Sequence, residues 1–168
     1  MAAKKEKTLN DLFEHGLKDI YYAEKKILTA LPKMAKATES EELAAAFEKH
    51  KRETEQQLSR LERVFKLLDQ PAKGKKCPGI DGILEEGKEV MEEFKGMPAL
   101  DAGLLAGAQA VEHYEITRYG TLIAWAEKLG LEEAVPLLQQ SLDEEKATDK
   151  ALTELAETAV NQYAEAAE

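Results

Sequence analysis

Residues 8–37, TLNDLFEHGLKDIYYAEKKILTALPKMAKA, carry apolar side chains at intervals of three and four residues. This spacing places them on one face of an α-helix, so it predicts a long amphipathic helix over the whole stretch. One position breaks the apolar face, because Glu24 stands between Tyr21 and Ile27. A carboxylate on a buried helix face is unfavourable unless a cation or a proton neutralises it. Glu24 is therefore the first candidate for a functional residue.

Three further stretches repeat the same apolar spacing and predict long helices over residues 40–69, 99–129 and 132–163. Thr38 with Glu41 three residues later resembles a capping box, and we take it as the start signal of the second helix. Gly130 is the predicted stop between the third and fourth helices.

The connection between the second and third long helices, residues 70–98, is too long for a hairpin turn. Residues 70–82 are rich in proline, glycine and lysine and predict a loop, and residues 83–94 predict a short amphipathic helix. Such a connection can act as a crossover, so the third long helix is expected to run parallel to the second. The expected fold is all-α: one domain over residues 1–168, with a four-helix bundle, a short fifth helix and frayed tails at residues 1–7 and 164–168.

Each long helix carries a glutamate on its predicted apolar face: Glu24, Glu53, Glu115 and Glu145. Glu24 and Glu53 lie 29 residues apart in the first predicted hairpin, and Glu115 and Glu145 lie 30 residues apart in the second. Each pair is centred on its predicted turn. At a rise of ~1.5 Å per residue, both pairs lie roughly 22 Å from the bend. The matched spacing suggests a repeated helical hairpin, with carboxylates converging on one level of the bundle.

Three more side chains extend this acidic set. His50 and Glu112 lie one helical turn before Glu53 and Glu115, and Asp149 lies one turn after Glu145. Residues three or four positions apart share a helix face, so one helix can offer two ligands to a metal pair. Carboxylates with at most one imidazole suit iron(II) or manganese(II) better than zinc. The predicted site is a pair of iron or manganese ions per chain.

The same residues also have structural interpretations. The Glu-x-x-Glu spacing recurs at Glu86 and Glu89 on a predicted solvated face, so this spacing alone is weak support for a site. His50 can be a hydrogen-bonded core histidine, or a partner that orients a ligand such as Glu53. The carboxyl groups can be protonated or joined by water. We rank cations first, because an unpaired buried carboxylate costs several kcal/mol against a total stability of only ~5–15 kcal/mol.

The composition narrows the class of protein. The chain has 168 residues, 43% hydrophobic and 33% charged, with a net charge of −10. This charge argues against a nucleic-acid partner, since phosphate binding needs a concentrated basic face. No apolar run approaches the ~18 residues that a membrane helix needs. The single cysteine, Cys77, cannot form an internal disulfide, so we expect a cytoplasmic protein.

Five segments together resemble the YciE/YciF-type bacterial stress proteins, a ferritin-like group. They are DIYYAEKKI (19–27), ALPKMAKA (30–37), AFEKHKRETEQQ (46–57), AVEHYEITRYGTL (110–122) and DEEKATDKALTELA (143–156). The resemblance covers residues 8–159. It implies a ferritin-like bundle with a fifth helix, a homodimer, and a dinuclear metal centre similar to that of rubrerythrins.

The resemblance also implies a ligand set. Glu24 would take the position on the first helix, Glu53 the position on the second, Glu112 and Glu115 the pair on the third, and Glu145 the first position on the fourth. The chain departs from the ferritin-like pattern at the two histidines that usually follow three residues after Glu53 and Glu145. Gln56 and Thr148 stand there instead, and His50 and Asp149 are the candidate substitutes.

Three functions follow from the sequence. The first is a di-iron or di-manganese protein that acts on oxygen or peroxide during stress. The second is a non-enzymatic bundle, stabilised by metal, that serves a structural or partner-binding role; the two missing histidines favour it. The third is a helical bundle without metal, whose inward glutamates are protonated or linked by water.

Overall fold

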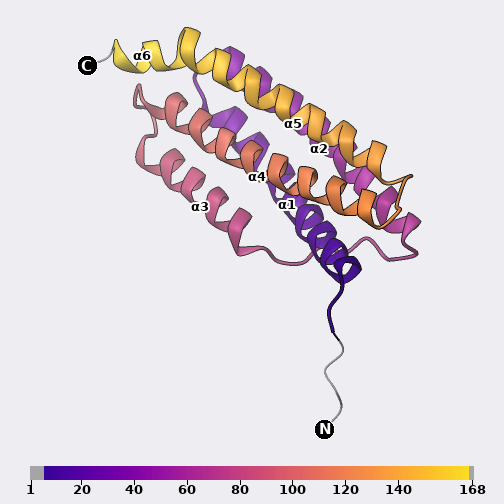
Figure 1. Ribbon diagram of the computed structural model, residues 1–168. Helices are drawn as coiled ribbons and strands as arrows, with labels where there is room; N and C mark the ends of the chain where they lie inside the picture. Colours follow the sequence, from indigo (N-terminus) through magenta and orange to yellow (C-terminus); the bar gives the residue numbers. More distant parts are fainter. Residues whose placement is uncertain (1–5, 167–168) are drawn as a thin grey trace.

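The computed structural model describes residues 6–166, and all regular elements within that range are helical (Figure 1). They are α1 (Leu9–Ala37), α2 (Glu41–Leu67), α3 (Pro78–Glu93), α4 (Leu100–Lys128), α5 (Val135–Leu155), the π-helical segment η1 (Ala156–Val160) and α6 (Asn161–Glu165). The predicted all-α, ferritin-like bundle is therefore confirmed.

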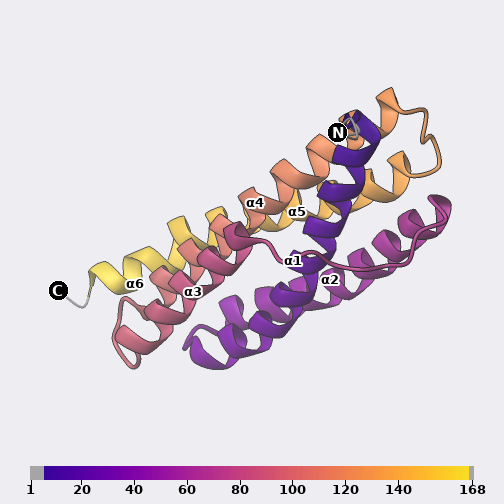
Figure 2. The ribbon, with the colours of Figure 1, turned by 90° about the horizontal axis from the view of Figure 1, so that it is seen from below.

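The four long helices enclose one core. α1 packs against α2 and α4, and α5 packs against the same two helices from the other side. Figures 1 and 2 show that α2 and α4 run in one direction and α1 and α5 in the other. The predicted parallel orientation of α2 and α4 is thus confirmed. α3 lies outside the bundle, against α4 and α1.

The crossover between α2 and α3 passes over the outside of α1. The backbone N–H of Lys75 donates to the carbonyl of Lys18 at 2.9 Å, which ties the segment to the helix. A Cβ on Gly74 would lie 3.1 Å from the backbone Cα of Tyr22, so glycine allows this close approach. The hydroxyl of Tyr22 donates to Asp81 at 2.7 Å and anchors the start of α3.

Several helix boundaries differ from the sequence-based prediction. α3 begins at Pro78, not at residue 83, because proline fits the first turn of a helix, where its missing N–H is not needed. The N-cap of α2 is Ser40, not Thr38. The Ser40 hydroxyl accepts from the N–H of Leu43 at 3.1 Å, whereas Thr38 is the C-cap of α1.

The last predicted helix is the least accurate. α5 begins at Val135, because residues 132–134 form a turn, and it passes into the π-helical segment η1, which nothing in the sequence indicated. Helix α6 continues to Glu165, so residues 164 and 165 are helical. Of the predicted tails, residues 1–5 and 167–168 lie outside the described residues, and Glu6 and Lys7 are exposed and outside any helix.

The core changes character along the bundle. At one end Phe13, Leu17 and Leu122 are fully or almost fully buried, and at the other Leu43 and Leu104 are. Between these apolar ends, each long helix turns polar side chains inward; they are Glu24, His50, Thr54, Gln57, Glu112, Glu115, Ser141 and Glu145. No helix in the part of the chain that the structure describes is long and apolar enough to cross a membrane.

Candidate metal centre

Four side chains from three helices meet in the polar middle of the core. His50 on α2, Glu112 and Glu115 on α4, and Glu145 on α5 each present one ligand atom, and these atoms all lie within 4.8 Å of one another. The Nε2 atom of His50 lies 3.2 Å from Oε1 of Glu112 and 3.8 Å from Oε2 of Glu115. Its Nδ1 atom lies 3.9 Å from Oε2 of Glu145. The imidazole therefore lies among three carboxyl groups, close to all of them.

Glu24 adds the fourth long helix to this group. Its side chain is fully buried, and its carboxyl contacts that of Glu115 closely enough for each to affect the pKa of the other. The hydroxyl of Tyr119, which is also fully buried, donates a hydrogen bond to Oε1 of Glu24. Each of the four long helices thus contributes at least one ionisable side chain to the interior.

Many polar atoms of this group have no hydrogen-bond partner within the protein. They are Oε2 of Glu24, both ring nitrogens of His50, Oε1 of Gln57, Oε2 of Glu112, both oxygens of Glu115 and Oε2 of Glu145. Buried polar groups in native proteins are nearly always satisfied by protein, water or an ion. Unpartnered carboxylate and imidazole atoms clustered at one place form a donor set that fits a divalent cation.

The electrostatics of the group point the same way. Burial, together with repulsion from Glu145, holds the pKa of Glu24, Glu112 and Glu115 well above the ordinary carboxyl range. Burial also raises the pKa of Glu145 to about 7 and lowers the pKa of His50 to about 4. Without a cation, these pKa shifts favour protonated carboxyl groups and a neutral imidazole. A bound cation would allow the carboxylates to ionise.

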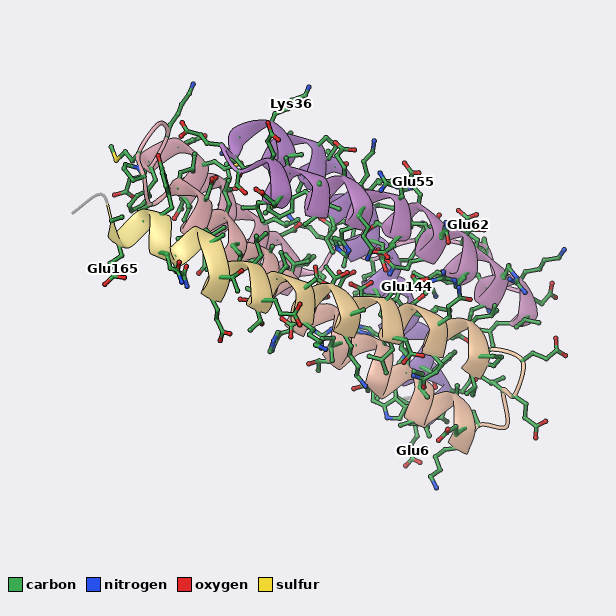
Figure 3. All side chains as sticks on the ribbon, turned by 90° about the horizontal axis from the view of Figure 1, so that it is seen from above. Glu6, Lys36, Glu55, Glu62, Glu144 and Glu165 are labelled. Carbon is green, nitrogen blue, oxygen red and sulfur yellow. The ribbon has the colours of Figure 1, made fainter. Side chains whose placement is uncertain are left out.

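A hydrogen-bond network supports the group from the α2–α5 side. The amide nitrogen of Gln57 donates to Glu145 and, at 3.1 Å, to Glu144. Glu144 in turn accepts two hydrogen bonds from the guanidinium of Arg60, at 2.8 and 2.6 Å. Figure 3 shows Glu144 between α2 and α5, whereas Glu55 and Glu62 of α2 point outward. Arg60 therefore balances one carboxylate beside the site and fixes the amide that holds Glu145.

Two of the predicted ligands lie outside the four-residue group. Glu53 is at the edge of the bundle with 20% of its side chain exposed; its Oε1 lies 2.7 Å from Nζ of Lys49, and its Oε2 accepts from Thr148 at 3.4 Å. Asp149 is half-buried and contacts Nε2 of His113 at 3.2 Å. The structure thus brings together His50, Glu112, Glu115, Glu145 and Glu24, and leaves Glu53 and Asp149 at the periphery.

The residues that support the group were harder to predict from the sequence. Gln57 belongs to the inward face of α2, so a role beside the site could be anticipated for its amide. Tyr119 falls on the inward face of α4, where an aromatic residue more often signals packing. Arg60 is only 6% exposed, although a charged residue at a helix position more often lies on the surface. Only the packed structure shows that Glu144 compensates its charge.

Comparison with known proteins places this geometry in a family. The profile of a family described as "Domain of unknown function (DUF892)" matches residues 8–165. Protein YciF from Escherichia coli (strain K12) is 46% identical over 160 residues, which make up 95% of this chain and 96% of that protein.

Solved structures agree with the sequence match. The crystal structure of the E. coli stress protein YciF has a TM-score of 0.88 and 46% identity, covering 93% of this chain and 99% of that one. YcfI from Rhodopseudomonas palustris has a TM-score of 0.86 and 47% identity, covering 91% and 98%. A protein from Xanthomonas campestris, 23% identical with a TM-score of 0.73 over 95% and 98% of the chains, shares the fold. The resemblance found in the sequence is confirmed: the chain belongs to the DUF892 family and is a homologue of the stress protein YciF.

Proposed function

We propose that this protein binds two iron or manganese ions in the polar middle of its bundle and acts there on dioxygen or peroxide. The observation that carries the proposal is the set of buried, unpartnered ligand atoms on His50, Glu112, Glu115 and Glu145. Such a set is costly in a folded protein unless cations or protons neutralise it. Three carboxylates and one imidazole suit iron(II) or manganese(II).

Two ions are favoured over one because Glu24 enlarges the donor set. Glu115 contacts Glu24 and also belongs to the four-residue group, so Glu24 would add its carboxylate to the ligands of that group. Glu24, His50, Glu112, Glu115 and Glu145 together would hold the two ions. Adjacent iron or manganese ions would supply Lewis acidity and electrons for the reduction of an O–O bond.

Two buried polar side chains position these ligands, and the apolar core around them excludes water. Tyr119 donates to Oε1 of Glu24 and leaves Oε2 of that carboxylate for a cation. Gln57 holds one oxygen of Glu145 in the same way and leaves the other. The core is apolar on both sides of the site, and these apolar layers keep bulk water from the ligands.

We further propose that Glu53 becomes a ligand when metal binds. Its present partners are Lys49, on the surface, and Thr148, which stands beside the site one turn from Glu145. A surface ion pair of this kind contributes only about 0.3–0.5 kcal/mol. A divalent cation near Glu145 would outweigh it and draw the Glu53 carboxylate inward.

The test is an anaerobic titration of metal-free protein with iron(II), followed by metal analysis and then by addition of dioxygen or peroxide. The proposal expects two ions per chain and an oxidation band that grows faster than for free iron. Anomalous scattering at the iron or manganese edge would place the ions. Glu53→Gln should weaken the binding of metal about tenfold or more, while the exposed control Glu55→Gln should not. Binding without turnover above free iron would reject the enzymatic part alone.

A non-enzymatic role is the second candidate. The observation that favours it is that the group contains one imidazole, with Gln56 and Thr148 in place of the two histidines of the ferritin-like pattern. A metal held mainly by oxygen ligands can join the four helices without cycling between oxidation states. In that case metal raises the thermal stability, Glu53→Ala lowers it in metal-containing buffer, and no oxidation is catalysed.

We also propose that the protein is a cytoplasmic homodimer. Leu9, Leu12 and Leu67 are exposed, and the start of α1 and the end of α2 lie at the same end of the bundle (Figure 1). Exposed apolar side chains at one end of the bundle suit a contact with a second copy of the chain. Light scattering should give twice the mass of one chain, and Leu12→Glu should shift it to the mass of one.

A further inference from the structure

A small cavity adjoins the candidate metal centre on the side of His50 and Glu112. It has a volume of about 20 Å³ and is lined by apolar side chains of α1, α2, α4 and α5, with Leu84 of α3. The polar residues of its lining are His50, Glu112 and Thr148. The supporting network of Gln57 and Arg60 lies on the opposite side of the centre, farther along α2.

The size and polarity of the cavity limit what it can hold. A volume of roughly 10–15 Å³ is enough for one water molecule, but a buried water also needs two to four polar partners. Although His50, Glu112 and Thr148 belong to the lining, the surface that faces the cavity is almost entirely apolar and offers a water molecule few partners. Hydrogen peroxide, which has two hydroxyl groups, would leave hydrogen bonds unmade there. A molecule of two apolar atoms fits both the volume and the lining, and a longer hydrocarbon does not fit the volume.

Only a thin wall separates the cavity from a groove on the surface. A groove of about 750 Å³ lies between α1 and α3, and its lining includes Ala30 and Leu84. The same two residues line the cavity, and both are half-buried. Ala30 and Leu84 therefore form the wall between the cavity and the outer groove, and the cavity meets the candidate ligands at His50 and Glu112.

We propose that this cavity is the holding site for dioxygen, which passes Ala30 and Leu84 and waits beside His50 and Glu112. The proposal rests on the proposed function, and it narrows the substrate from an oxygen or peroxide species to the apolar diatomic molecule. The short side chains of Ala46 and Ala108 leave the space open, each one helical turn before His50 and Glu112.

Xenon tests the cavity without any metal, because it binds dry apolar cavities. Crystals of metal-free protein under xenon pressure should show one xenon atom beside Ala108. Ala108→Val should remove it, while Ala110→Val, on the exposed face of the same helix, should leave it in place. Should Ala108→Val fail to fold, Ala46→Val fills the cavity from α2. An absence of xenon from the wild-type cavity would overturn the proposal.

The iron(II)-loaded protein tests the choice of dioxygen. In Ala108→Val, oxidation by dioxygen should slow about tenfold or more, while oxidation by peroxide should change less than about twofold because peroxide does not use the apolar route. Leu84→Phe should slow the dioxygen reaction, whereas Glu86→Phe, on the exposed face of the same helix, should not. An equal effect on both oxidants would overturn the assignment of dioxygen.

These measurements separate the two proposals. If the protein binds no metal, the proposed function fails, yet the xenon map still decides whether the cavity takes an apolar guest. If metal binds and xenon does not, the cavity proposal fails and the metal centre stands.

Discussion

At the scale of single residues, the middle of the core combines deep burial with several acidic side chains. Glu112, Glu115 and Glu145 are almost completely buried, and a charged carboxylate there is unfavourable unless it is paired. Protons can neutralise these groups at low pH, and cations can do so at neutral pH. Neutralisation by protons and neutralisation by cations predict opposite effects of substitution and of pH on the protein.

A substitution at Glu115 distinguishes them. Glu115→Gln keeps the shape of the side chain but needs no proton, so the metal-free variant should be more stable than metal-free wild type at pH 8. Its affinity for manganese(II) should fall at least about tenfold. Urea unfolding with chelator and a calorimetric titration with manganese(II) measure the two effects. Glu86→Gln, on the exposed face of α3, is the control and should change neither.

The pH dependence of the metal-free protein follows from the same shifts. The pKa values of Glu24, Glu112 and Glu115 are raised on folding, and that of Glu145 is raised to about 7. The stabilisation from a raised carboxyl pKa is complete below the unfolded value and is lost as the pH rises through the folded value. Stability without metal should therefore fall with rising pH, by about 1.4 kcal/mol per pH unit for each carboxyl that stays protonated only in the folded state.

The lowered pKa of His50 changes stability with pH in the opposite sense, so it determines the pH range of the experiment. Its pKa is lowered to about 4, so its contribution is complete above the unfolded value and is lost as the pH falls toward the folded one. Between about pH 7.5 and 8.5 the imidazole is mostly neutral in both states, and the carboxyls dominate. Thermal melts with chelator should show falling midpoints over this range, and melts with manganese(II) should not. A midpoint that rises with pH in chelator would contradict the raised carboxyl pKa values.

Residue-level prediction from sequence succeeded where the helix face was unambiguous. Glu24, Glu115 and Glu145 interrupt clear apolar stripes, and all three are buried. On α2 the inward positions are His50, Thr54 and Gln57, and Glu53 is rotated from Thr54 by about 100°. The apolar pattern there is too weak to choose between neighbouring residues. Packing against α5 decides the rotation of the helix, so the sequence could not place Glu53.

At the scale of elements, the start of α2 shows how local chemistry and tertiary contacts combine. Ser40 caps the helix through its hydroxyl, and its own N–H donates to Asp101 of α4 at 2.9 Å. The N–H of Glu39 donates to the other oxygen of Asp101 at 3.1 Å. Asp101 thus ties the α1–α2 turn to the beginning of α4. Both Thr38 and Ser40 are good capping residues, and the partner of the turn, 61 residues away, is not visible in local sequence.

Ser40→Ala should therefore destabilise the metal-free protein by about 1 kcal/mol, because the N–H of Leu43 loses its partner. Thr38→Ala should cost less than half as much, since the Ser40 N–H that its hydroxyl accepts from keeps its bond to Asp101. Urea unfolding of both variants at one pH measures the difference. A larger effect at Thr38 would mean that the α1–α2 turn is held mainly by the threonine.

The helices themselves were largely predictable, and the irregular parts were not. Long amphipathic stripes predicted α1, α2 and α4 to within two residues at each end. η1 has no distinguishing sequence pattern, because a π-helical turn depends on how the segment packs and not on the types of its residues. The start of α3 was placed too late because the proline and glycine of residues 78–82 were read as loop signals. Proline occurs both in loops and in the first turn of a helix, so Pro78 alone could not decide between the two.

At the scale of the whole molecule, the crossover determines what the site can be. It lets α2 and α4 run in parallel on opposite sides of the core, so that each contacts both α1 and α5. Ligands from all four helices can then meet at one depth, whereas α3 lies outside and contributes none. The two helical hairpins joined in this way enclose an acidic middle. Without metal these acidic groups weaken the bundle, and with metal they would hold its four helices together.

The metal should therefore stabilise the four long helices together and leave α3 less affected. Saturation at 100 times the dissociation constant adds about 2.7 kcal/mol to the folded state. Hydrogen exchange followed by mass spectrometry should show slower exchange around Glu24, His50, Glu115 and Glu145 on addition of manganese(II), with little change in residues 78–93. This pattern requires ligands from every long helix, since an ion held by one pair would protect only that pair. Protection confined to α4 and α5 would show that the ion does not join the two hairpins, and the binding role given to Glu24 and His50 would then be wrong.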